Sequence, residues 1–185
     1  GSTGDRVVQR DAEYEIVETA RKGNTESFGV LYARHYASMV WLAYSIVLDR
    51  SLAEDAAQQA FCKACEKLAD LKRADRFVPW LAQICRNEAH QLLRDRRRLQ
   101  SAASVDTESE AIGRTDGPDL GPVKAAVDAL APMYREIVVL HYYQRMDYRQ
   151  IAATLGIAGH TVRGRLFRAR KQIEQTLRRN GFPER

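Results

Sequence analysis

The 185-residue sequence contains few cysteines, no long apolar run and no glycine loop of the phosphate-binding kind. Its three cysteines do not suggest the framework of a secreted disulfide protein. No stretch approaches the roughly 18 apolar residues of a membrane helix, so we predict no membrane insertion. The first residues lack the basic and apolar layout of a signal peptide. We therefore expect a cytoplasmic protein.

Residue patterns typical of catalytic or metal sites are also missing. The four histidines form no triad with a nucleophile, and no second ligand pair accompanies Cys62 and Cys65. On a helix these two cysteines fall at the edge of an apolar stripe, where we expect buried or half-buried small side chains. A thiol-sensing role is the weaker alternative. We expect no cofactor, no metal and no enzymatic activity.

The net charge of +5 is only mildly basic, but the charges are unevenly distributed. Residues 72–98 carry eight basic and three acidic side chains, and residues 159–179 carry seven basic and one acidic. Residues 104–120 carry five acidic side chains and one basic. A charge run is usually a solvated helix face, but two basic blocks that each end a helical segment favour contact with nucleic acid.

Helical periodicity dominates and no alternating strand pattern appears, which predicts an all-α fold. The segment 99–121 lacks periodicity and indicates a flexible acidic linker between two small helical domains, 5–98 and 122–185. Ser51 with Glu54 resembles a capping box at the start of one helix. The expected helices cover residues 11–21, 25–48, 51–71, 78–98, 122–130, 132–144, 148–155 and 159–178.

The C-terminal domain has the spacing of a helix-turn-helix. Gly156 supplies the positive φ of the turn, and Ala152 allows the two helices to approach closely. The last helix has an apolar stripe of Val162, Leu166, Ala169, Ile173 and Leu177. Its other side is polar and mostly cationic, as a helix in the major groove of DNA requires. That side comprises His160, Thr161, Arg163, Arg165, Arg168 and Lys171.

Two alternatives remain open for this domain. The arginines can read guanine or grip phosphate, and a helical hairpin with a solvated basic face would show a similar pattern. Phe167 falls on the polar side. We expect it to pack against a neighbouring helix or domain, with a thymine methyl or a partner as the less favoured contact.

Two faces in the N-terminal domain also suit binding. The helix expected over 78–98 has an apolar stripe, and the opposite side suits nucleic-acid backbone and unpaired bases, although a solvated helix would look alike. That side carries Gln83, Arg86, Asn87, His90, Arg94 and Arg97. The helix expected over 51–71 instead shows a weakly acidic face, which suits a protein partner or solvent. That face carries Asp55, Gln58, Gln59 and Glu66.

Two sets of motifs stand out in the sequence. The first is Ala53-Glu54-Asp55-x-x-Gln58-x-x-Phe61 with Phe77-x-x-Trp80-Leu81-x-x-Ile84-x-Arg86-Asn87. The second is Leu130-x-Pro132-x-x-Arg135-Glu136-Ile137 with Tyr148-x-x-Ile151-Ala152-x-x-Leu155-Gly156 and Thr161-Val162-x-x-Arg165-Leu166-x-Arg168-Ala169-Arg170. They resemble, in this order, domain two and domain four of the extracytoplasmic-function (ECF) sigma factors of bacterial RNA polymerase. The match spans about residues 11–178, so the resemblance covers nearly the whole chain.

The resemblance implies three binding surfaces. Contact with core polymerase would come from Asp55, Gln58, Gln59 and Phe61. Contact with the melted −10 element would come from Arg73, Arg76, Trp80, Arg86, Asn87, His90, Arg94 and Arg97. Contact with the duplex −35 element would come from His160, Thr161, Arg163, Arg165, Arg168 and Lys171.

The resemblance thus implies an alternative sigma factor that directs promoter recognition and transcription initiation in a stress or envelope response. Its partners would be core RNA polymerase, promoter DNA and an anti-sigma factor, and it would join the nucleoid when bound to polymerase. The alternative is a free-standing helix-turn-helix regulator that does not act through core polymerase. That alternative leaves the N-terminal motifs unexplained.

Overall fold

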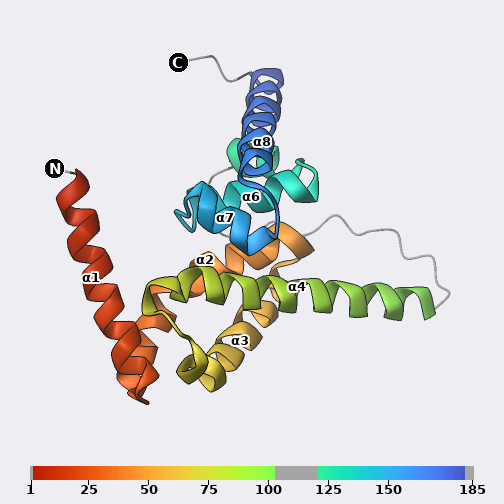
Figure 1. Cartoon of the computed structure of the whole chain (residues 1–185). Coiled ribbons are helices and arrows are strands. Elements are labelled where there is room, and N and C mark those ends of the chain that lie inside the picture. The colour runs from red at the N-terminus through yellow and green to blue at the C-terminus, as the bar shows by residue number, and fades with distance from the viewer. Residues whose placement is uncertain (1, 103–120, 182–185) are drawn as a thin grey trace.

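The computed structural model describes residues 2–102 and 121–181, and within these ranges it contains helices and no strand (Figure 1). The all-α prediction is confirmed. The N-terminal unit comprises α1 (Ser2–Arg21), α2 (Thr25–Val47), α3 (Arg50–Lys67), the 3₁₀ turns η1 (Leu68–Asp70) and η2 (Ala74–Arg76), and α4 (Phe77–Ala102). The C-terminal unit comprises α5 (Gly121–Asp128), α6 (Pro132–Tyr142), α7 (Tyr148–Leu155) and α8 (Gly159–Arg179).

The helix starts follow from local capping. The Ser27 amide donates to the Asn24 side chain over 2.8 Å at the start of α2. At the start of α3 the cap is Asp49, whose carboxylate accepts from the Leu52 amide over 3.1 Å. The prediction that Ser51 caps this helix is wrong. Asp49 is an equally good capping residue and it comes earlier, so α3 has already begun at Ser51.

The predicted linker 99–121 is shorter than expected. Residues 99–102 continue α4, and Gly121 begins α5, so only residues 103–120 lie between the two helices and outside the described residues. The sequence from 94 to 102 contains four arginines with one leucine, one glutamine and one alanine, all strong helix formers, and it contains no glycine or proline to end α4.

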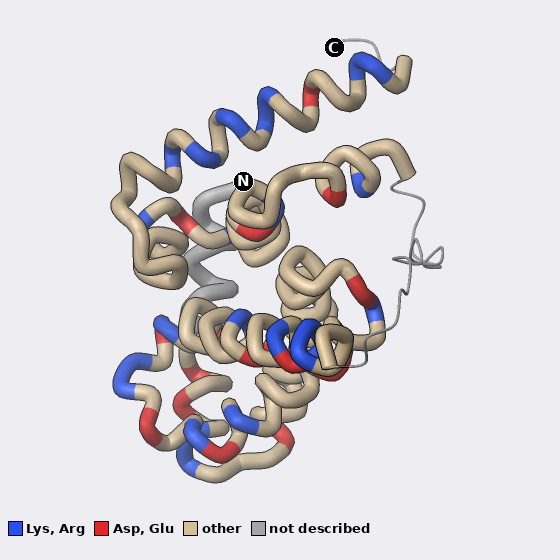
Figure 2. The backbone as a smooth tube through the Cα atoms, turned by 90° about the vertical axis from the view of Figure 1, so that its right-hand side faces the viewer, with Lys and Arg blue, Asp and Glu red and all other residues tan. Residues whose placement is uncertain are grey.

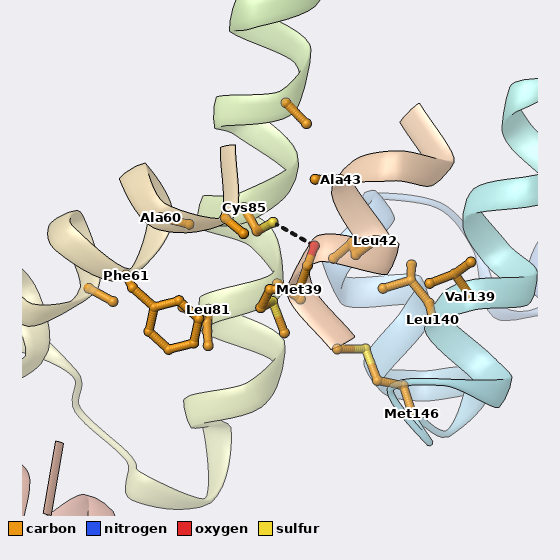
Figure 3. Packing of buried hydrophobic residues seen from close by; sticks show 14 of the residues in the cluster. Met39, Leu42, Ala43, Ala60, Phe61, Leu81, Cys85, Val139, Leu140 and Met146 are labelled. Carbon is orange, nitrogen blue, oxygen red and sulfur yellow. Dashed lines mark hydrogen bonds between the residues drawn. The ribbon is translucent and has the colours of Figure 1, made fainter. Parts of the chain in front are cut away.

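The core of the N-terminal unit forms where α2, α3 and α4 meet. Alanines line one side of α3 and are fully buried, so this helix can lie close to its neighbours. Met39 of α2 and Leu81 of α4 are also fully buried. The Cys85 thiol donates to the Met39 carbonyl over 3.4 Å, which ties α4 to α2 (Figure 3). The predicted apolar stripes of α3 and α4 are confirmed.

The two units share one hydrophobic core instead of only a tether. Leu42 on α2 belongs to the same buried cluster as Leu140 on α6 and Met146 after it (Figure 3). Helix α6 is buried over six consecutive residues, Arg135–Leu140, because α2 covers one side of it and α8 another. A helix buried on more than one side needs apolar residues around most of its circumference. The periodicity of the sequence alone did not reveal that α2 of the N-terminal unit packs against α6.

The shared core makes a stability prediction. We expect Leu42→Ala to lower the free energy of unfolding by about 2–5 kcal/mol, because a fully buried leucine leaves a cavity between α2 and α6. The measurement is urea unfolding followed by circular dichroism. Leu99→Ala serves as the control, since Leu99 is exposed near the end of α4 and its loss should change the value by less than about 0.5 kcal/mol. Equal effects of the two substitutions would contradict the shared core.

Candidate nucleic-acid interface

Helices α7 and α8 form the predicted helix-turn-helix. Asp147 and Gln150 make a reciprocal capping box at the start of α7, with bonds of 2.7 and 3.0 Å between side chain and backbone. The helix ends at Gly156, whose φ of +64° is the left-handed conformation expected there. Buried Ile151 on α7 faces buried Val162 and Leu166 on α8. The turn therefore holds α8 at a fixed angle.

The predicted cationic side of α8 is open to solvent. His160, Arg163, Arg168 and Lys171 are exposed, and Thr161 and Arg165 are half-buried. Figure 2 shows lysines and arginines spaced along α8. Within the described residues Arg163, Arg165, Arg168 and Lys171 make no ion pair, whereas Arg178 of the same helix pairs with Glu174. Arg170 differs, because it donates to the Tyr142 hydroxyl over 2.7 Å and stacks on that ring. The free donors remain available for phosphate or base edges.

Phe167 also lies on the outer side of α8 and is 66% exposed. The prediction that it packs against a neighbouring helix or domain is wrong. The buried stripe of α8 is formed by Val162, Leu166 and Ala169. Phe167 follows Leu166 directly, and one helical step turns its side chain away from this stripe toward solvent. An exposed phenylalanine between arginines leaves the contact with a thymine methyl or a partner as the remaining prediction.

The predicted polar side of α4 is divided in two. Gln83, Asn87, Arg94 and Arg97 are exposed, whereas Arg86 and His90 face the C-terminal unit and are half-buried. Arg86 forms an ion pair with Glu136 of α6 and donates to the Thr154 carbonyl of α7 over 3.2 Å. The structure therefore does not bring all six predicted side chains onto one free face.

The segment before α4 carries the remaining predicted −10 residues. Arg73 makes a bidentate contact with Asp75, with bonds of 3.0 and 2.7 Å. That hydrogen bonding holds the pKa of Asp75 below its usual range, although the residue is exposed. Arg76 lies 4.0 Å from the same carboxylate, and half-buried Trp80 packs against Phe77. Asp75 thus offsets part of the cationic charge here.

The predicted acidic face of α3 is present. Asp55, Gln58 and Gln59 are exposed on one side of the helix. Phe61 is only 3% exposed and packs edge-on against Tyr32 of α2, with ring centroids 4.8 Å apart. The prediction that Phe61 belongs to the contact surface is wrong for this arrangement, because its side chain falls on the alanine stripe. Phe61 instead supports the face from behind.

The cysteines are distributed differently from the prediction. Cys62 and Cys65 are exposed, because the stripe of α3 that packs inward is made by alanines and Phe61. The expectation of buried or half-buried side chains is therefore wrong for these two. Cys85 is buried, and burial raises the pKa of its thiol to about 12, with Glu88 adding to the rise. Among the described residues no group of three or more histidine, cysteine or acidic side chains could hold a metal ion.

The contact between the units contains charged residues whose burial sequence reasoning missed. The Arg135 side chain donates to the carbonyls of Ser45, Asp128 and Leu130. Its neighbour Glu136 pairs with Arg86. The available signal was the position of Arg135 and Glu136 directly before the apolar run 137–140. Charged side chains next to such a run are buried only when they have partners, so their position indicates partners elsewhere in the fold.

An apolar groove of about 560 Å³ lies where α2 meets the C-terminal unit. Trp41 and Tyr44 of α2 form one wall, and Val127 of α5 and Leu177 of α8 contribute to the other. Lys124 bridges the walls, donating to the Tyr44 hydroxyl over 3.0 Å and to Asp128 over 2.6 Å. Both units are needed to form this groove.

Two family models match this chain, one in each of the two units. The family model for Sigma-70 region 2 matches residues 31–99, and that for Sigma-70 region 4 matches residues 120–173. The RNA polymerase sigma factor CarQ of Myxococcus xanthus is 30% identical over 165 residues, which cover 87% of this chain and 95% of CarQ. This chain belongs to the extracytoplasmic-function sigma factors. Sigma factors are transcription initiation factors that act with RNA polymerase.

Further relatives support the assignment and the fold of this sigma factor. The sigma factor RfaY of Xanthomonas campestris is 32% identical over 171 residues, and these cover 85% of this chain but only 42% of that protein. The sigma factor RpoE of Bartonella quintana, solved with the anti-sigma factor NepR, superposes with a TM-score of 0.70 at 28% identity, covering 83% of this chain and 98% of that one. No helix among the described residues is long and apolar enough to cross a membrane.

The position of His90 predicts a pH dependence of stability. Burial lowers the pKa of His90; Glu136 opposes this, and the cations Arg86 and Arg94 add to it. A histidine whose pKa falls on folding stabilises the native state above about pH 6.5, and that contribution is lost as the pH falls further. We expect the urea unfolding free energy to decline from pH 7 to pH 5, and His90→Gln to flatten part of that decline. The control His160→Gln, on an exposed position, should retain the wild-type profile. A profile for His90→Gln identical to wild type would contradict this account.

Proposed function

We propose that this sigma factor binds core polymerase through α3 and reads promoter DNA with both units. One observation carries the proposal. The same chain combines a region 2 match that includes the exposed acidic face of α3 with a region 4 match that includes the unpaired cations of α8. A free-standing helix-turn-helix regulator would need only the second of these.

Helix α8 is the proposed reader of the −35 element as duplex DNA. The turn at Gly156 holds it firmly, and its outer side offers His160, Thr161, Arg163, Arg165, Arg168 and Lys171. A helix enters the major groove with its N-terminal part at the base edges. We assign His160 and Thr161, the first residues of this set, to contacts with base edges. Lys171, the last of the set, is assigned to phosphate.

Helix α4 and the segment before it are the proposed binding surface for the non-template strand of the −10 element. Asn87, Arg94 and Arg97 offer exposed donors along successive turns, and Arg73, Arg76 and Trp80 lie at the start of the helix. Melting a promoter requires unstacking energy, which binding of the separated bases offsets. The proposed mechanism therefore needs no catalytic residue in this chain.

The exposed face of Asp55, Gln58 and Gln59 is the proposed docking surface for core polymerase. Its weakly acidic character disfavours DNA and suits a basic or polar protein surface. We further propose an anti-sigma partner, as in the RpoE complex, and a role in a stress or envelope response in the cytoplasm, with nucleoid association in the polymerase-bound state.

Reconstitution with core RNA polymerase is the direct test. We expect the full chain to form a stable complex that gives promoter-dependent transcripts, and we expect Asp55→Lys to weaken that complex. Asp70→Lys is the matched control, because Asp70 is exposed on η1 outside the proposed docking surface. The absence of both complex and transcripts with the unaltered chain would overturn the proposal.

Duplex recognition is tested on α8. We expect Arg168→Ala to weaken binding of the holoenzyme to −35 duplex DNA by about 1–3 kcal/mol, because one exposed guanidinium with no protein partner is lost. Gel-shift titration measures the effect. Arg179→Ala, also exposed but at the far end of the helix, should leave binding nearly unchanged. Equal losses in the two variants would indicate a nonspecific charge effect.

Strand opening is tested separately on α4. We expect Arg94→Ala to slow formation of the open complex about tenfold, through the loss of one charged hydrogen bond, while −35 duplex binding is retained. Permanganate footprinting of unpaired thymines measures opening. Arg98→Ala is the control, since Arg98 is an exposed arginine on the same helix outside the proposed strand surface. A defect in duplex binding equal to that of Arg168→Ala would contradict the division of labour.

A further inference from the structure

One ion pair among the described residues joins the two units, and it involves a residue assigned to promoter DNA. Arg86 of α4 pairs with Glu136 of α6, and their side chains are only 17% and 12% exposed. The same guanidinium donates to the Thr154 carbonyl of α7 over 3.2 Å. Two helices of the C-terminal unit therefore accept hydrogen bonds from Arg86.

These contacts exclude a nucleic-acid strand from the same place. A guanidinium that donates to a carboxylate and a carbonyl inside a contact between units has no room for a phosphate or an unpaired base. His90, one turn further along α4, is half-buried beside the same pair. Asn87, Arg94 and Arg97 remain exposed, so only the middle of the proposed strand surface is covered.

We propose that the Arg86–Glu136 pair is an autoinhibitory latch. In the packed arrangement, Glu136 occupies the guanidinium that would otherwise hold the −10 strand, so strand binding requires the C-terminal unit to move off α4. The carboxylate and the DNA strand compete for one side chain. This inference rests on the proposed role of α4 in strand binding.

The interface suits a latch of this kind. A buried ion pair contributes little net stability, because both charges lose water, but removal of one partner leaves the other uncompensated. The pair therefore specifies the packed arrangement and makes it sensitive to the loss of Glu136. Apolar contacts between Leu42 and Leu140 provide the rest of the attraction, and at the rim the Gln144 amide donates to the Ser38 carbonyl over 2.7 Å.

The first test removes the carboxylate. In the free chain we expect Glu136→Gln to raise the affinity for single-stranded −10 DNA about tenfold, measured by fluorescence anisotropy of labelled DNA. Glu136→Lys, which places a like charge opposite Arg86, should do the same if the first variant retains too much of the bond. The control is Glu174→Gln, since Glu174 pairs with Arg178 within α8 alone. No gain in either Glu136 variant over this control would overturn the latch.

A conformational readout accompanies this test. The ring centroids of Trp41 and Tyr143 lie 5.4 Å apart across the contact between the units. With Trp80→Phe as background and without DNA, Trp41 is the remaining tryptophan, and its emission should shift to longer wavelength in the Glu136 variants as the units separate. Because Trp80 lies on the proposed strand surface, strand affinity is measured in chains that keep it. Tighter strand binding without this shift would overturn the requirement for movement.

The second test prevents the movement. Ser38→Cys with Gln144→Cys, in a Cys62→Ser and Cys65→Ser background, allows a short bis-maleimide to join α2 to the end of α6. We expect the cross-linked chain to lose promoter opening with core polymerase and the same chain before cross-linking to keep it. Equal opening before and after cross-linking would overturn the latch and leave the proposed function standing. Failure of the uncross-linked chain to support transcription would overturn the proposed function and the latch with it.

Discussion

A buried guanidinium must find acceptors for its donors, and this requirement at Arg135 organises the molecule. Its three carbonyl acceptors lie on α2, at the end of α5 and in the turn before α6. These bonds fix α6 to the rest of its own unit and to the N-terminal unit at once. The helix-turn-helix packs on α6, so these bonds contribute, with the shared apolar core, to the position of α8 relative to α4.

The small net charge is the sum of surfaces with different chemistry. Arg163, Arg168 and Lys171 of α8 are exposed, whereas at the start of α4 Asp75 offsets part of the charge of Arg73 and Arg76. Such partial neutralisation weakens nonspecific attraction to phosphate, which depends on the number of charges neutralised on binding. We expect a sigma factor with this distribution to depend on polymerase for tight binding to DNA.

Periodicity predicted the helices and most of the buried stripes, because each depends on residues three or four apart in sequence. Gly156 and the stripe from Val162 to Ala169 are examples where local geometry decides the outcome. The prediction failed where a distant element decides it. Periodicity places Arg86 on a polar face of α4, but Glu136, fifty residues later, pairs with it and covers it. The helical spacing places Phe61 on the alanine stripe, where it is buried, and only the family motif assigns it to the contact surface.

The groove between Trp41 and Leu177 has walls from both units, so it exists only while the units are packed together. Any molecule that fills it would bind one arrangement of the chain and not the other, and its binding free energy would be added to that arrangement alone. By reciprocity, DNA that requires separated units would weaken the affinity of such a molecule by the same factor. Groove and promoter would thus exclude each other without sharing a single contact residue.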